Sequence, residues 1–310
     1  MKRFRVFAIF TAASTFFLIF LGGLVRVSGA GLGCPDWPRC FGRWIPPINV
    51  SELPVDMDTS FFNFTLAWIE YINRLFGMFV GLLILAVAIV AVRGYRHVPR
   101  IIVPAIIAPL LTAFQGWLGG QVVASELAPL MVSAHLLIAV VIGSLMLYIA
   151  QETYFLEMGQ KQLHSSCPRT MRFLLGGIWL LVALQIVLGT QMRESIERLL
   201  SRSPLLADSA VLHQLGSLGT IHLAVGIIVV VGIVIVFVGC MSGKNKPSSY
   251  MMQLVWALFG LVVIQLVLGF CLYGMGLPEV VQVLHMWSAT VLAGLTMLTF
   301  SALRFRRDPK

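Results

Sequence analysis

The chain has 310 residues, of which 58% are hydrophobic and only 11% are charged, and its mean hydropathy is +0.91. A soluble domain with this composition would expose a large apolar surface, so the composition excludes a soluble globular protein and predicts that lipid covers the chain. The net charge of +9 does not indicate a nucleic-acid partner, because the basic residues are spread over the connections between apolar segments.

Eight apolar segments are long enough to cross a bilayer, which takes about 20 residues each. In chain order they cover residues 7–25, 64–92, 101–123, 130–150, 173–192, 213–239, 252–273 and 280–302. The segments are continuously apolar rather than alternating, which predicts helices that satisfy their own backbone hydrogen bonds in lipid. We therefore predict an all-α integral membrane protein with eight transmembrane helices and with lipid as its surroundings.

Basic residues indicate the topology. Seven of the 22 Lys and Arg residues are expected on the outer side, and the other 15 lie at both chain ends and in alternate connections: Lys2, Arg3, Arg5, Arg93, Arg96, Arg100, Lys161, Arg169, Arg172, Lys244, Lys246, Arg304, Arg306, Arg307 and Lys310. The positive-inside rule then places both termini in the cytoplasm. We expect the first span to be retained rather than cleaved, and the absence of an Arg-rich, Ser-rich leader favours a bacterial plasma membrane.

The two halves of the chain repeat each other. Residues 115–147 align with residues 265–297, so that Gln115, Gly119 and His135 fall on Gln265, Gly269 and His285; weaker matches place Leu21, Gly22 and Arg26 on Leu188, Gly189 and Arg193, and Asn73 on His222. This predicts two four-helix bundles, residues 1–152 and 153–310, related by a pseudo-twofold axis along the membrane normal. The long outer connection at 29–63 belongs to the first half, and a second one, at about 194–212, has the same place in the second half.

Histidines inside the spans are the first candidates for chemistry. His222 and His285 come from alternate helices of the second half and lie at similar depth, so they could ligate a heme iron from both sides. The alternative is that each imidazole bonds a neighbouring helix. The duplicated spacing favours the heme interpretation.

The first half places Glu70, Asn73 and Arg74 on one helix opposite His135. Glu70 and Asn73 are three residues apart and share a helix face. Glu70 is a candidate proton shuttle in a substrate pocket beside His135. The alternative is a simple ion pair between Glu70 and Arg74, which are four residues apart.

Two of the five cysteines, Cys34 and Cys40, lie in the outer connection. Outside the cytoplasm a disulfide can persist, either as a structural staple or as a redox-active pair. Zinc is the weaker interpretation, because this connection offers two soft ligands and no histidine. Cys167, Cys240 and Cys271 are interpreted as unpaired small apolar residues.

These residues carry a resemblance to a known family. The chain resembles heme A synthase along nearly its whole length, through a glycine and arginine motif at 22–26, the outer motif Gly29-Ala30-Gly31-Leu32-Gly33-Cys34-Pro35-Asp36-Trp37-Pro38, the pair Glu70-Tyr71, the stretch Gln115-Gly116-Trp117-Leu118-Gly119-Gly120, and the three histidines His135, His222 and His285. The outer motif is the most specific of these features.

The resemblance implies a membrane enzyme that oxidises a methyl group of heme O to the formyl group of heme A, the cofactor of terminal cytochrome oxidases. It implies a heme b between His222 and His285, and Glu70 beside the reacting edge of the substrate heme. The substrate site would be formed by His135, Asn73 and Arg74, and the outer cysteine pair would be Cys34 and Cys40. A heme O synthase and a terminal cytochrome oxidase are the partners that it implies.

One position departs from the family pattern. Asn73 stands where the family's helix motif has a histidine, and Asn is a poor heme ligand. This leaves His135 as the candidate axial ligand in the first half, with the other iron position open or bound by water.

Two other functions compete with the enzyme: a non-catalytic heme protein that carries electrons or delivers heme, and a transporter. Glu70 favours the enzyme, since an electron carrier needs no acid at the heme edge. The transporter is least favoured, because the spans lack paired Gly/Pro interruptions at mid-depth.

Overall fold

The computed structural model describes residues 1–54, 59, 62–158, 167–202, 214–242 and 247–304. Over these residues the chain forms eight long helices: α1 (Lys2–Val27), α2 (Phe64–Gly94), α3 (Pro99–Ala124), α4 (Pro129–Met158), α5 (Arg169–Arg202), α7 (Gly216–Met241), α8 (Ser249–Gly274) and α9 (Glu279–Ala302). All eight are long and apolar enough to cross a membrane. The prediction of an all-α fold with eight helices long and apolar enough to span a membrane is confirmed for the described residues.

Two short 3₁₀ helices, η1 (Ala30–Leu32) and η2 (Val50–Glu52), lie in the connection between α1 and α2. Some of the basic residues used to predict the topology fall outside the described part of the chain: Lys161, Lys244, Lys246, Arg306, Arg307 and Lys310.

Helix starts follow local chemistry. The Asn63 side chain accepts a hydrogen bond from the Leu66 N–H at the start of α2, and the Ser248 side chain accepts one from Met251 at the start of α8. Pro99 begins α3, where its missing N–H costs nothing.

The fifth helix is longer than its apolar segment. We expected an outer connection from about residue 194, but α5 continues to Arg202. Ion pairs at i,i+4 carry the helix onward, since Arg193 pairs with Glu197 and Glu194 pairs with Arg198. The predicted boundary at 194 is therefore wrong, because charged residues can extend a helix beyond the apolar layer.

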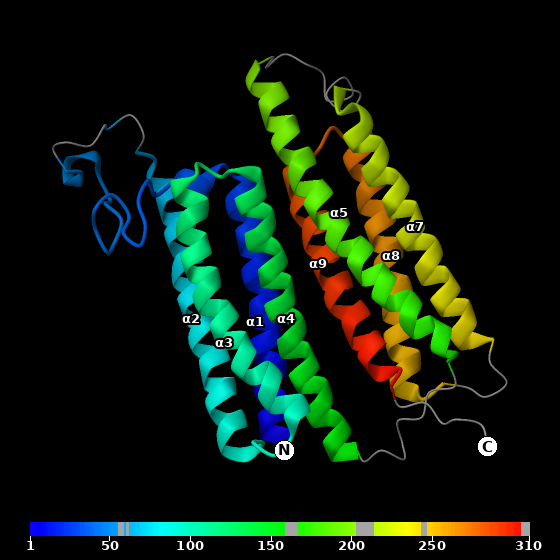
Figure 1. Cartoon of the computed structure of the whole chain (residues 1–310). Helices are drawn as coiled ribbons and strands as arrows, with labels where there is room; N and C mark the ends of the chain where they lie inside the picture. The colour runs from blue at the N-terminus through cyan, green and yellow to red at the C-terminus, as the bar shows by residue number, and fades with distance from the viewer. Residues whose placement is uncertain (55–58, 60–61, 159–166, 203–213, 243–246, 305–310) are drawn as a thin grey trace.

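Helices α1 to α4 pack on one another, as do α5, α7, α8 and α9, and α1 and α4 contact α9 where the two sets meet. Figure 1 shows the start of α1 and the end of α9 at one end of the molecule, and the connection between α1 and α2 at the other. We call the latter the loop end. It also carries the end of α5 and the start of α7 (Figure 1).

Polar groups join the two sets of helices. The Gln151 amide on α4 donates to the Leu298 carbonyl on α9, and the Trp287 indole donates to the Phe16 carbonyl on α1. Many large apolar side chains on these helices are exposed, as expected for helices in lipid, and Phe173, for example, is 79% exposed.

Two of the three cysteines that were interpreted as unpaired form a disulfide. The structure joins Cys167 to Cys240, with Cα atoms 4.6 Å apart. The start of α5 lies beside the end of α7 because these helices pack antiparallel, and this brings together two residues that are 73 positions apart in sequence. Cys271 is a free, half-buried thiol, as predicted.

Candidate functional site

The second set of helices brings His222 and His285 together. His222 lies on α7 and His285 on α9, and their ring centroids are 6.5 Å apart with the ring planes inclined by 51°. The Nδ1 atoms of both rings are buried and have no hydrogen-bond partner among the described residues. A buried polar atom without a partner is rare in native proteins, so these rings are suited to an additional ligand.

This spacing fits a shared iron. Two imidazoles that bind one metal from opposite sides, each with a metal–nitrogen bond of about 2.0–2.1 Å, have ring centroids about 6.4 Å apart. Heme iron accepts histidine ligands at its axial positions. The spacing of the two rings is therefore compatible with axial ligation of one heme iron, and that His222 and His285 bind a heme stays a prediction.

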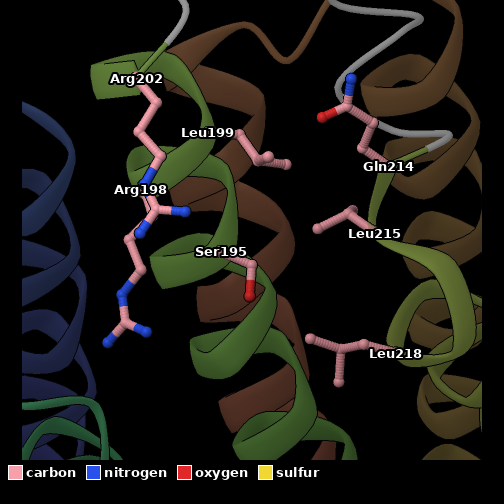
Figure 2. Close-up of a pocket in the computed structure, with 7 residues that line it drawn as sticks. All are labelled: Ser195, Arg198, Leu199, Arg202, Gln214, Leu215 and Leu218. Atoms are coloured by element: carbon pink, nitrogen blue, oxygen red, sulfur yellow. The ribbon is translucent and has the colours of Figure 1, made fainter.

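A pocket opens one helical turn from His222, towards the loop end. Leu218 precedes His222 by four residues on α7, so both share a helix face. Figure 2 shows Ser195 and Leu199 of α5 facing Leu215 and Leu218 across the gap, with Arg198 and Arg202 on another side of α5. The cavity has a volume of about 240 Å³ and is completed by Gln214.

The first set of helices carries His135 on α4 and Asn73 on α2. His135 Nδ1 and Asn73 Oδ1 are both buried without a hydrogen-bond partner in the described chain. The His135 ring lies against α3, where a Cβ added to Gly119 would be 3.3 Å from His135 Cε1. His135 is thus held against a neighbouring helix with one ring nitrogen still unpartnered.

Glu70 and Arg74 form the ion pair that the sequence offered as the alternative. Glu70 is only 4% exposed, and its Oε2 also accepts the Cys34 backbone N–H at 2.7 Å. Arg74 donates to the carbonyls of Asp36 and Arg39, both at 2.8 Å. These two side chains therefore anchor the cysteine loop, residues 34–40, to α2. The role of Glu70 as a proton shuttle stays a prediction.

The cysteine loop is closed by a disulfide between Cys34 and Cys40. A Cβ at Gly33 would lie 2.4 Å from the Leu66 carbonyl oxygen, so only glycine lets the loop backbone approach α2 this closely. Trp37 reaches α3, where a Cβ at Gly120 would be 3.0 Å from its ring. The loop therefore connects α2 with the part of α3 that supports His135.

Sequence reasoning missed the partners of the three glutamines that precede these histidines. Gln115, Gln185 and Gln265 each donate to the backbone carbonyl of a histidine on the next helix. The repeat already contained the signal, because Gln115 and Gln265 matched along with the histidines. The group of Arg26, Glu194 and Glu197, which joins α1 to α5, was also missed.

Comparison with known proteins gives the family. A model of the family described as "Cytochrome oxidase assembly protein" matches residues 5–298. A protein of Geobacillus kaustophilus named Heme A synthase is 24% identical over 316 residues, which cover 99% of this chain and 94% of that protein.

Two further relatives, also named Heme A synthase, match in part. The protein of Shewanella oneidensis is 34% identical over 150 residues, which are 46% of this chain and 43% of that protein. The protein of a Wolbachia strain from Brugia malayi is 28% identical over 193 residues, which are 56% of each chain. The matched region thus spans about half the length of these two relatives. Together with the match over residues 5–298, these similarities show that the chain belongs to the heme A synthase family of cytochrome oxidase assembly proteins.

Proposed function

We propose that this protein is a membrane oxidoreductase that converts heme O to heme A by oxidising a methyl group to a formyl group. The family and its relatives named Heme A synthase support a role in heme A synthesis. The observation that carries the proposal within this chain is the pair His222 and His285, whose spacing of 6.5 Å suits a heme iron. The resident cofactor would be heme b in residues 153–310.

Heme b, when bound, supplies one-electron redox chemistry. His222 and His285 are the residues that would hold this heme. Leu218 lies one helical turn from His222 on α7, and with Leu199 and Leu215 it forms the apolar part of the pocket wall at the loop end. This half of the protein is therefore suited to electron transfer rather than to binding the reacting group.

Residues 1–152 take the substrate heme O. His135 would be its axial ligand, and Asn73, being a poor ligand, would leave the other iron position open or bound by water. Written with water as the oxygen donor, oxidation of a methyl group to a formyl group releases four protons and four electrons, and the electrons leave to an acceptor outside this chain. Glu70, next to Arg74, would accept protons from this oxidation. Glu70 has a second task, since it also holds the Cys34 amide. An experiment on Glu70 must therefore separate chemistry from the anchoring of the loop.

The two halves would be related by a pseudo-twofold axis, with both termini in the cytoplasm of a bacterial cell. The loop end then faces outward, which places the Cys34–Cys40 disulfide in an oxidising compartment. The heme O would come from a heme O synthase in the same membrane, and the heme A would pass to a terminal cytochrome oxidase.

The experiment measures hemes extracted from cells that express each variant and that contain heme O. Glu70→Gln retains an oxygen that accepts the Cys34 N–H but loses the charge, so we expect loss of heme A with heme b retained. His135→Ala should lose binding of the substrate heme. Near-normal heme A from both variants would place the reaction elsewhere.

A second measurement tests the heme b assignment independently. His222→Ala and His285→Ala should each abolish the low-spin heme b absorption in purified protein, while Asn73→His should add a low-spin signal from the first half. An unchanged low-spin spectrum in both alanine variants would contradict the assignment.

A further inference from the structure

Three histidines share one supporting arrangement. In the pairs α3 and α4, α5 and α7, and α8 and α9, a glutamine on the first helix donates to the backbone carbonyl of the histidine on the second, at 2.7, 2.7 and 3.1 Å. Four residues after each glutamine, a glycine lies under the histidine ring. The contacts from an added Cβ to the ring Cε1 are 3.3 Å at Gly119, 3.8 Å at Gly189 and 3.5 Å at Gly269.

Each module thus has the form Gln-x-x-Leu-Gly on one helix and His on the next. Gln and Gly are four residues apart and face the same partner helix. The glutamine amide fixes the position of the histidine backbone along the neighbouring helix, and the glycine, which has no Cβ, lets the histidine ring approach that helix closely. Because a side chain on an α-helix has few allowed rotamers, these two contacts together determine the orientation of the imidazole.

The remaining helix pair, α1 and α2, lacks both polar members. Its sequence is Leu18-Ile19-Phe20-Leu21-Gly22, with Leu18 in place of Gln and Asn73 in place of His. The structure supports this equivalence, because Leu18 lies 4.0 Å from a Cβ built at Gly77, and Gln185 lies 2.8 Å from one built at Gly226. Both glycines are four residues after the Asn73 or His222 position.

We propose that Gln185 and Gln265 are positioning residues that hold the axial histidines of the retained heme, and that Gln115 does the same for His135. The pair α1 and α2 keeps the glycine, Gly22, but has Asn73 in place of the histidine ligand and Leu18 in place of the supporting glutamine. The second half therefore has two supported ligands for a heme that stays, and the first half has one for a heme that must enter and leave. This inference rests on the proposed function.

The first test uses purified protein with heme b bound. Gln265→Leu and Gln185→Leu introduce the residue found at position 18. Both glutamines hold the backbone carbonyl of their histidine, and Gln265 Nε2 also lies 3.3 Å from His285 Nε2. Loss of a partner of the ligating ring lowers metal affinity about 10–100-fold, and we expect loss of heme b on dilution. The reduced protein should also bind carbon monoxide, which a firmly six-coordinate iron excludes.

Gln151→Leu is the matched control. Gln151 also donates from a buried amide to a carbonyl on another helix, that of Leu298, but this carbonyl belongs to no histidine. The variant should lose thermal stability with an unchanged low-spin spectrum and no carbon monoxide binding. If Gln151→Leu and Gln265→Leu changed the spectrum equally, the glutamines would contribute only to helix packing and not to histidine orientation, and the proposal would be overturned.

A gain-of-ligand experiment avoids variants that fail to fold. Asn73→His is compared with the double variant Leu18→Gln, Asn73→His, and the low-spin fraction of the first-half heme is measured by electron paramagnetic resonance. We expect the double variant to exceed the single one by several fold. Equal low-spin fractions in the single and double variants would show that the glutamine does not support the histidine, and the proposal would be overturned. If wild-type protein shows no low-spin heme b at all, the proposed function fails instead, so the two failures are distinguishable.

Discussion

Replacing Gly33 by alanine tests how the cysteine loop is held. The added Cβ would lie 2.4 Å from the Leu66 carbonyl oxygen, whereas ordinary contact begins at 3.4 Å, so the loop must retreat by about 1 Å. The hydrogen bond of 2.7 Å from the Cys34 N–H to Glu70 would then stretch beyond the usual limit of about 3.2 Å. Overpacking of this kind costs about 1–3 kcal/mol.

A cost of about 2 kcal/mol corresponds to about a thirtyfold shift in the equilibrium between docked and undocked loop. Hydrogen exchange resolved to single residues is the assay. The Cys34 amide should exchange about thirtyfold faster. The Phe41 and Gly42 amides follow the loop directly and donate to Asp36 of the loop, so they should keep their rates and serve as an internal control.

The control variant is Gly116→Ala on α3, where an added Cβ meets nothing within 4 Å. It should leave the Cys34 amide unchanged. Unchanged Cys34 exchange in Gly33→Ala would refute the close approach of loop and helix, and equal acceleration at Phe41 would show that the loop unfolds rather than undocks.

Three further predictions concern stability and redox state. Arg26→Gln removes pairs to Glu194 at 3.1 Å and Glu197 at 2.5 Å; because these groups are partly exposed, we expect a loss of at most about 1 kcal/mol, seen as a lower melting temperature whose deficit shrinks in high salt. A deficit that does not change with salt would contradict this. Gln151→Leu should lower stability by about 1 kcal/mol, and unchanged melting would argue against the bond to Leu298. Cys34 and Cys40 should react with a thiol label in fresh membranes only after reduction, and full labelling without reductant would show that they are not paired.

Helix positions could be predicted because a long apolar run has one stable conformation in lipid. The proximity of His222 and His285 could be predicted as well, since both lie at similar depth on alternate helices of a repeated unit. The tertiary contacts between separate segments could not be predicted from the sequence. Neither the docking of Cys34 on Glu70 nor the bond between Cys167 and Cys240 follows from sequence spacing, because each depends on how separate segments pack.

The end of α5 could not be predicted from the sequence either, because charged residues extend this helix. The stretch after Arg193 is too polar for a membrane segment, yet i,i+4 pairs extend α5 to Arg202. At the site, the ion pair of Glu70 with Arg74 could be established only once the direction of both side chains was known, and the role of Glu70 as a proton shuttle stays a prediction. The glutamine contacts needed the same information, because a repeat identifies equivalent residues without showing what they touch.

The central claim is tested most directly by identifying hemes by mass. The wild-type chain would be expressed in cells that make heme O and lack any other source of heme A, and the pigments of membranes and of purified protein would be extracted. We predict heme A in the membranes, together with heme b in the purified protein. Membranes that contain heme O and heme b but no heme A would contradict the proposed synthase and leave a heme-binding protein without this activity.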